Sequence, residues 1–112
     1  MFDLREHKGI IRSLVSEANE NDAIWHWSLK ALSKTKASIF WSYLEYEGHK
    51  PCFTIELDET EDDCMIRAKD EHGDILNWEM VECKYLPHLN TPIEYAIKMM
   101  AYTIINTAHS CY

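Results

Sequence analysis

Glycine and proline are scarce in this 112-residue sequence, which has three of each, and no two of them are adjacent. A phosphate-binding loop needs several glycines close together, and a linker between domains is usually rich in glycine, serine or proline. The sequence has neither pattern. It therefore predicts one domain over residues 1–112 and no nucleotide-binding loop.

The cysteines and histidines lack the spacing of a metal site. The four cysteines include no C-x-x-C pair, and His49 and His109 each have a cysteine close by but no second pair at a zinc-site distance. The acidic run that starts at Asp58 has Asp63 and Lys69 where an EF-hand needs glycine and glutamate. We expect no metal and no cofactor.

Long apolar runs are also missing. No stretch approaches the roughly 18 apolar residues of a membrane span. Charged residues at Asp3, Arg5 and Glu6 interrupt the segment where a signal peptide would need its apolar core. We therefore expect a cytoplasmic protein that makes no membrane contact and has reduced cysteines.

Negative charge is present in excess and is concentrated in one part of the chain. The net charge is −8, whereas residues 45–82 alone hold 13 acidic and 3 basic residues, a net charge of −10. The remaining residues are close to neutral. Such a surface repels nucleic acid and attracts basic proteins, so we expect no direct nucleic-acid binding.

Residue spacing predicts two helices. Asp3 followed by Glu6 is typical of a capping box, and apolar residues then recur at helical spacing as far as Ala18. Near the C-terminus, Thr91 and Pro92 are typical of a helix start. An apolar stripe follows them: Ile93, Ile97, Met100, Ile104 and Ala108.

Between the helices the pattern indicates strands. Residues 39–46, 51–58, 63–69 and the segment after Gly73 alternate in polarity, and residues 24–32 fit either a strand or a short helix, with the strand favoured. The predicted fold is α+β: an antiparallel four- or five-stranded β-meander flanked by an N-terminal and a C-terminal helix packed on one face.

Matching apolar residues across the predicted hairpins gives a register. It sets Leu57 opposite Cys64, then Ile66 opposite Trp78 and Cys64 opposite Met80. The inward set would comprise Phe40, Leu44, Phe53, Ile55, Leu57, Ile66, Leu76 and Trp78. The outward set would then comprise Trp41, Tyr43, Glu45, Thr54, Glu56, Met65, Arg67, Asn77 and Glu79.

An outward face with two aromatic rings among carboxylates suggests a binding surface. The leading hypothesis is a small non-catalytic protein that neutralises a basic partner, such as a toxin or a nucleic-acid-handling enzyme, as immunity proteins and phage-encoded inhibitors do. The proposed contact residues are Trp41, Tyr43, Glu45, Glu56, Asp58, Glu59, Glu61, Asp62, Asp63, Asp70 and Glu71.

Three alternatives remain open. The acidic face is solvated and serves only solubility, or the chain is a secretion or assembly chaperone that forms a homodimer through Trp25, Trp27 or the last helix. The third is a magnesium-dependent nuclease that uses Glu82-x-Lys84 with Asp63 or Asp74 upstream.

Overall fold

The computed structural model describes residues 2–22, 25–43, 51–59, 63–82 and 91–111. Within them the chain forms a 3-10 helix η1 (Leu4–His7), helix α1 (Lys8–Glu20), strands β1 (Trp25–Leu32), β2 (Lys36–Tyr43), β3 (Cys52–Glu59), β4 (Asp63–Lys69) and β5 (Ile75–Glu82), and helix α2 (Thr91–Cys111). The strands make one antiparallel sheet in the order β1-β2-β3-β4-β5. The predicted α+β meander is confirmed, and residues 25–32 supply its fifth strand.

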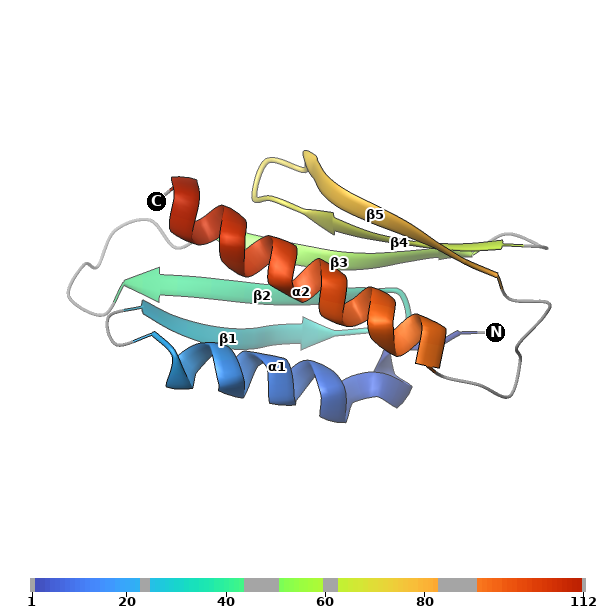
Figure 1. Cartoon of the computed structure of the whole chain (residues 1–112), viewed down its shortest axis with the longest axis horizontal. Coiled ribbons are helices and arrows are strands. Elements are labelled where there is room, and N and C mark those ends of the chain that lie inside the picture. Colours follow the sequence, from blue (N-terminus) through green and yellow to red (C-terminus); the bar gives the residue numbers. More distant parts are fainter. Residues whose placement is uncertain (1, 23–24, 44–50, 60–62, 83–90, 112) are drawn as a thin grey trace.

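Both helices cover the same face of the sheet. Helix α1 packs against β1, and α2 crosses β5, β4 and β3 beside it (Figure 1). The other face has no helix over it within the described residues, and we call it the open face. None of the described helices is long and apolar enough to cross a membrane.

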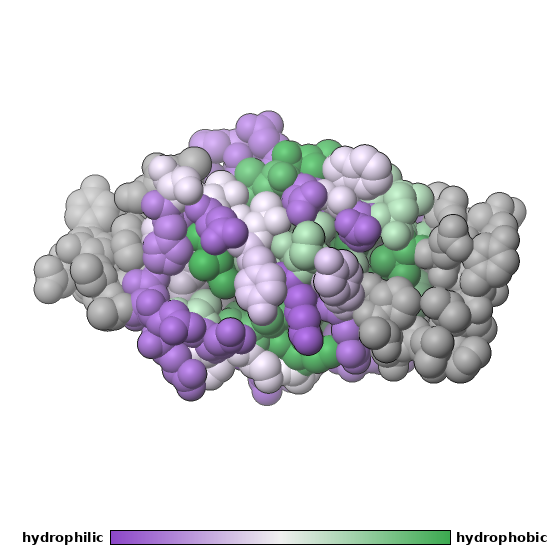
Figure 2. Space-filling model, viewed as in Figure 1, coloured by the Kyte–Doolittle hydropathy of each residue, from purple (hydrophilic) through white to green (hydrophobic). Residues whose placement is uncertain are grey.

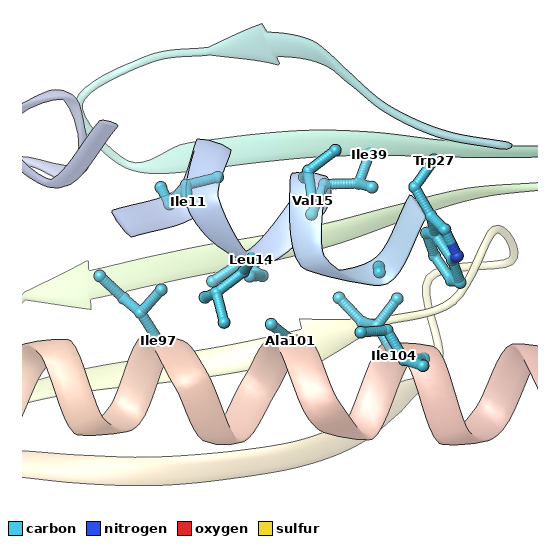
Figure 3. A pocket seen from close by; sticks show the side chains of 11 residues that line it. Ile11, Leu14, Val15, Trp27, Ile39, Ile97, Ala101 and Ile104 are labelled. Atoms are coloured by element: carbon cyan, nitrogen blue, oxygen red, sulfur yellow. The ribbon is translucent and has the colours of Figure 1, made fainter. Parts of the chain in front are cut away.

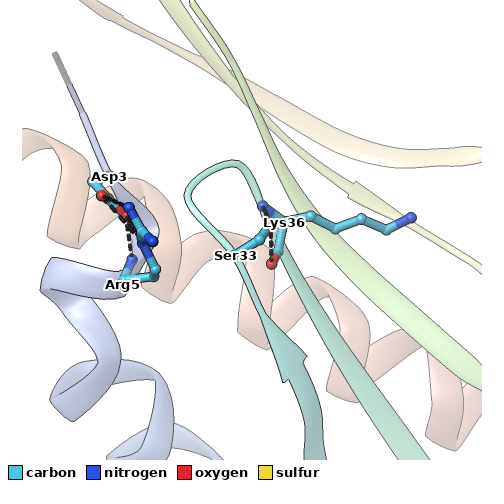
Figure 4. Close-up of polar contacts among 4 residues, drawn as sticks. All are labelled: Asp3, Arg5, Ser33 and Lys36. Carbon is cyan, nitrogen blue, oxygen red and sulfur yellow. Dashed lines mark hydrogen bonds and ion pairs between the residues drawn. The ribbon is translucent and has the colours of Figure 1, made fainter.

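The N-terminal segment is fixed by a side-chain cap and by a tight turn of the sheet. The Asp3 carboxylate accepts a hydrogen bond from the Arg5 backbone N–H at 3.0 Å and pairs with the Arg5 guanidinium at 2.7 Å (Figure 4). This guanidinium lowers the pKa of the Asp3 carboxyl to about 2. The Leu4 N–H donates to the Lys34 carbonyl in the turn that Ser33 and Lys36 close, so the predicted cap at Asp3 is confirmed and is joined to the sheet.

Helix α2 places its apolar stripe on the sheet as the sequence predicts. The five stripe residues Ile93, Ile97, Met100, Ile104 and Ala108 are at most 1% exposed. Their spacing of three or four residues keeps them on one side of the helix, where burial stabilises the packing by about 2 kcal/mol for each large side chain.

An aromatic stack joins β1 to β2 at the centre of the core. Trp27 and Trp41 face each other in the strand register, and their ring centroids lie 5.4 Å apart. The Asn19 side chain of α1 accepts a hydrogen bond from the Trp27 N–H and donates one to the Trp27 carbonyl. The amide of Asn19 thereby ties α1 to the β1 backbone.

The predicted orientation of β2 is wrong by one residue. Trp41 was expected on the outward face, yet it is 0% exposed and packs inward together with Ile39. Phe40, expected in the core, lies half-buried on the open face, where the Lys30 ammonium is 4.5 Å from its ring centroid. Both the odd and the even positions of β2 carry apolar residues, so the alternation alone could not show which set faces the core. The stack of Trp41 on Trp27 sets the orientation.

The β3–β4 hairpin is confirmed, but its register differs from the prediction by two residues. Leu57 lies opposite Ile66 and Ile55 opposite Ala68, whereas the sequence paired Leu57 with Cys64. A shift of two keeps every side chain on its face, so apolar still meets apolar and the hydrophobic pattern could not reveal the shift.

The β4–β5 register differs by one residue, which has a larger effect. A bulge between Ala68 and Lys69 sets Ile66 opposite Glu79 and Arg67 opposite Trp78. An odd shift moves each side chain of one strand to the other face. Trp78, predicted in the core, is therefore 55% exposed on the open face.

Substitution of Trp41 should cost more stability than substitution of Trp78, the reverse of the order that the predicted orientations imply. Trp41→Ala should lower the free energy of unfolding by about 3–5 kcal/mol, because it empties a core site. Trp78→Ala, the matched control on the open face, should lower it by less than about 1 kcal/mol. Urea unfolding followed by far-UV circular dichroism measures both, and equal losses would contradict the assigned orientations.

Candidate binding surface

The acidic residues predicted at the centre of the outward face are paired with bases. Glu56 lies 2.7 Å from the Lys69 ammonium and 3.8 Å from that of Lys36, and Asp58 lies 3.3 Å from the Arg67 guanidinium. Lys36, Glu56, Asp58 and Arg67 line a polar hollow of about 300 Å³. The central part of the open face is thus a network of neutralised charges, and it does not present Glu56 and Asp58 as a free anionic surface.

Two further predicted contact residues have structural roles. The Glu59 carboxylate accepts a hydrogen bond from the Phe2 backbone N–H at 2.8 Å. The Asp70 carboxylate accepts hydrogen bonds from the N–H groups of His72 and Asp74, and Gly73 takes the left-handed conformation with φ 85° that favours glycine. Asp70 is therefore needed to hold the β4–β5 turn in shape.

The remaining predicted residues fall into three groups. Glu71 lies half-buried in the β4–β5 turn. Tyr43 ends β2 and Asp63 begins β4, but their side chains lie outside the described parts of the structure. Glu45, Glu61 and Asp62 lie wholly outside the described residues. Among the predicted contact residues whose side chains the structure describes, Trp41 is excluded from the surface by burial.

Exposed apolar residues are found on β5, whereas the sequence predicted an exposed aromatic residue at Trp41. Of the five large hydrophobic residues that are exposed within the described residues, three lie on this strand: Ile75 at 53%, Trp78 at 55% and Met80 at 43%. The register places Trp78 and Met80 beside Arg67 and Met65, on the open face. We call Ile75, Trp78 and Met80 the β5 patch.

The chain around this patch is strongly acidic. The segment 70–82, which comprises the β4–β5 turn and β5 and which we call the outer arm, contains five acidic residues and no lysine or arginine. It lies at the edge of the sheet, and no described element lies beyond it (Figure 1). Exposed apolar side chains and negative charge therefore occur together on an edge strand, whereas on β3 and β4 the two charges compensate.

Asn77 closes part of the open edge of β5. Its side-chain carbonyl accepts a hydrogen bond from the Trp78 backbone N–H at 2.9 Å, and its amide donates to the Thr103 hydroxyl of α2 at 3.0 Å. An edge strand otherwise leaves such N–H groups ready to pair with another strand. Asn77 thus occupies one edge donor with a side chain of the same chain.

The cavity between the helices and the sheet is too small for a ligand. Apolar side chains from α1, α2 and the sheet point toward one another across it, among them Leu14, Ala101 and Ile39 (Figure 3). A water-sized sphere reaches only about 20 Å³ of this space, and the lining offers no polar group. A water molecule there would lack hydrogen-bond partners, so the cavity is a packing defect of the core.

A polar pair at the far end of the helices ties α2 to the rest of the fold. His109, in the last turns of α2, lies 3.5 Å from the nearly buried Asp22 carboxylate, and its ring meets Trp41 edge-on at 5.5 Å between centroids. His109 also lines a groove of about 160 Å³ together with Glu17 and Tyr102. These contacts fix the end of the helix against the core.

The structure also bears on the chaperone and nuclease hypotheses. Trp27 is 2% exposed, so it cannot supply a dimer contact as the chaperone hypothesis supposes. The β4–β5 register sets Asp63 opposite Glu82, as a nuclease would need, although their side chains and Lys84 lie outside the described residues. The described residues contain no group of three or more metal-ligating side chains.

Sequence reasoning missed Trp78 as a surface residue because β5 alternates apolar residues in a way that suits either face. A weak signal was available in α2, where Thr103 interrupts the apolar side of the helix and provides a polar partner for Asn77. That pairing requires Asn77 to face the helices and Trp78 to face away.

The Glu56–Lys69 ion pair should make stability depend on pH. The hydrogen bond from Lys69 lowers the pKa of the Glu56 carboxyl below its ordinary value of 4.5. A lowered folded-state pKa stabilises the fold above the unfolded-state value, and that contribution disappears as the pH falls below about 4.5 through the folded-state pKa. The partly exposed pair should be worth no more than about 1 kcal/mol.

This dependence can be measured by urea unfolding of wild type and Glu56→Gln between neutral pH and the acid range. The difference between the two proteins should shrink toward zero in acid. Glu17→Gln on the exposed side of α1 is the control. A wild-type–variant difference that is constant with pH would contradict the assigned ion pair.

The described residues bring exposed apolar and acidic residues together on the outer arm. No family model, curated protein or solved structure matches the chain.

Proposed function

We propose that the chain is a non-catalytic protein that binds and neutralises a basic protein partner in the cytoplasm, and that the outer arm carries the contact. The exposure of the β5 patch beside the acidic turn is the observation that supports this proposal. Trp78 takes the anchoring role that the sequence suggested for Trp41.

The chemistry of protein interfaces supports this choice of surface. Tryptophan and methionine are enriched where proteins bind one another, and an exposed tryptophan that becomes fully buried contributes strongly to affinity. On the helix-bearing side, by contrast, the apolar side chains are interrupted by polar ones (Figure 2). The β5 patch is therefore the better anchor within the described surface.

The charge of the outer arm supports a basic partner. The segment holds five acidic residues and no lysine or arginine, so it attracts a positively charged surface and speeds association. Proteins that handle nucleic acids display such surfaces to bind phosphates, and carboxylates can occupy the same positions. An immunity protein or a phage-encoded inhibitor of a nuclease would act in this way.

The cytoplasmic part of the proposal is supported by the cysteines. Cys52 and Cys64 are free thiols in the structure, and free thiols are typical of proteins in a reducing compartment.

The anchor is tested by truncating Trp78. The partner is captured by crosslinking in the cells that express the chain, purified, and titrated by calorimetry. Trp78→Ala should weaken binding by about tenfold or more, because it removes the largest apolar contact. Tyr95→Ala is the matched control, since Tyr95 is an aromatic residue with similar exposure, 59%, on α2. Loss of affinity in neither variant, or equally in both, would exclude the β5 patch as the anchor.

The charge is tested without disturbing the turn. The double variant Asp74→Asn, Glu79→Gln keeps Asp70, which holds the turn. It should slow association about two- to tenfold at low salt and flatten the dependence of the rate on salt, with little change in dissociation. Stopped-flow measurements over a salt series decide this, and an unchanged association rate would show that these acids do not steer the partner.

A magnesium-dependent nuclease is the second candidate, favoured by the register that sets Asp63 opposite Glu82. Two carboxylates at adjacent strand ends can hold a divalent cation that activates water. On this hypothesis the purified chain cleaves plasmid DNA or RNA with Mg²⁺, and Glu82→Ala abolishes the cleavage. Wild-type protein without cleavage, or cleavage that survives in Glu82→Ala, would rule it out.

A further inference from the structure

We infer that the outer arm binds an extended basic segment of its partner as an additional strand, alongside β5, with main-chain hydrogen bonds at the open edge. The inference rests on the proposed function and specifies how the same surface recognises its partner. The occupant is a strand in which basic residues alternate with apolar ones.

β5 is the edge strand of the sheet: it spans eight residues and pairs with β4 on one side only. In an antiparallel strand the N–H and C=O of one residue point to the same side, and residues two apart point alike. Since the Trp78 N–H is bonded to the Asn77 side chain and not to β4, the Trp78 and Met80 main-chain groups face the open side.

An exposed edge strand that displays apolar side chains can pair with another strand, and charges on such an edge oppose a strand of the same charge. β5 displays its apolar patch, and its central donor is occupied only by the neighbouring Asn77 amide. A carbonyl from an incoming strand can replace this side chain at the Trp78 N–H, which is the hydrogen-bonding mode of strand addition.

A second copy of the chain would bring two outer arms together, each with five acidic residues and no lysine or arginine, so like charges would oppose the pairing. A strand with alternating basic and apolar residues complements both features of the arm. Its basic side chains meet residues such as Asp74 and Glu79, and its apolar ones cover Trp78.

The experiment compares two substitutions at one position. Met80→Pro removes an outward N–H, which an edge strand tolerates, whereas Met80→Ala removes the same side chain and keeps the N–H. The probe is a synthetic octapeptide of alternating lysine and valine with blocked ends. Binding is measured by calorimetry and by amide exchange along β5, after circular dichroism has shown that each variant is folded.

Strand addition predicts saturable binding that weakens with salt and protects the Trp78 and Met80 amides from exchange. Met80→Pro should weaken binding about tenfold more than Met80→Ala. A control peptide with proline in place of the central valines should not bind. No saturable binding up to millimolar peptide, or equal effects of the two substitutions, would overturn strand addition.

Asn77→Ala provides an independent arm if Met80→Pro does not fold. Removal of the competing carbonyl should tighten peptide binding about two- to fivefold, and unchanged or weaker binding would overturn the inference. Light scattering tests the other occupant. A dimer that Met80→Pro abolishes would show that a second copy, and not a basic strand, occupies the edge.

The two levels of the proposal fail separately. If the captured partner depends on Trp78 but Met80→Pro and Met80→Ala weaken its binding equally, the proposed function stands and the partner contacts side chains alone. If the partner binds independently of Trp78, the β5 patch is not its binding site and both proposals fail.

Discussion

The bulge between Ala68 and Lys69 determines what the molecule displays on its surface. It shifts β5 by one residue along β4, so Val81 and Asn77 face the helices and Trp78 and Met80 face away. Two independent contacts agree with this register: Val81 is buried, and Asn77 donates a hydrogen bond to Thr103 of α2. Because side chains alternate strictly along a strand, one extra residue changes the surface of the whole edge.

The two helices reinforce the same division of faces. Together they cover one side of the sheet, where the Trp27–Trp41 stack and the α2 stripe fill the core. The opposite side is left to short-range cross-strand contacts: ion pairs on β3 and β4, and the cation–aromatic contact of Lys30 with Phe40 on β1 and β2. Among the described residues of this side, the large apolar groups that are exposed lie toward the edge, on β5.

Charge is divided in a corresponding way. The acids of β3 have basic neighbours on β2 and β4, and such exposed pairs change stability little. The outer arm holds five acidic residues and no lysine or arginine, next to the β5 patch at the edge of the sheet. This combination is what the proposed binding of a basic and partly apolar partner rests on.

The residue pattern was enough to predict the elements: the N-cap at Asp3, the stripe of α2 and the succession of strands all follow from local rules of backbone conformation and polarity. It also located the excess of acid. The tertiary structure decided which face each strand turns to the core, because alternation fixes only relative orientation. Trp41 is buried and Trp78 is exposed, the reverse of the prediction, because the Trp27 stack and the bulge between Ala68 and Lys69 set the absolute orientation of β2 and β5. Likewise, only the register of β3 on its neighbours decided that Glu56 and Asp58 are neutralised, since charge pairing depends on residues that are distant in the chain.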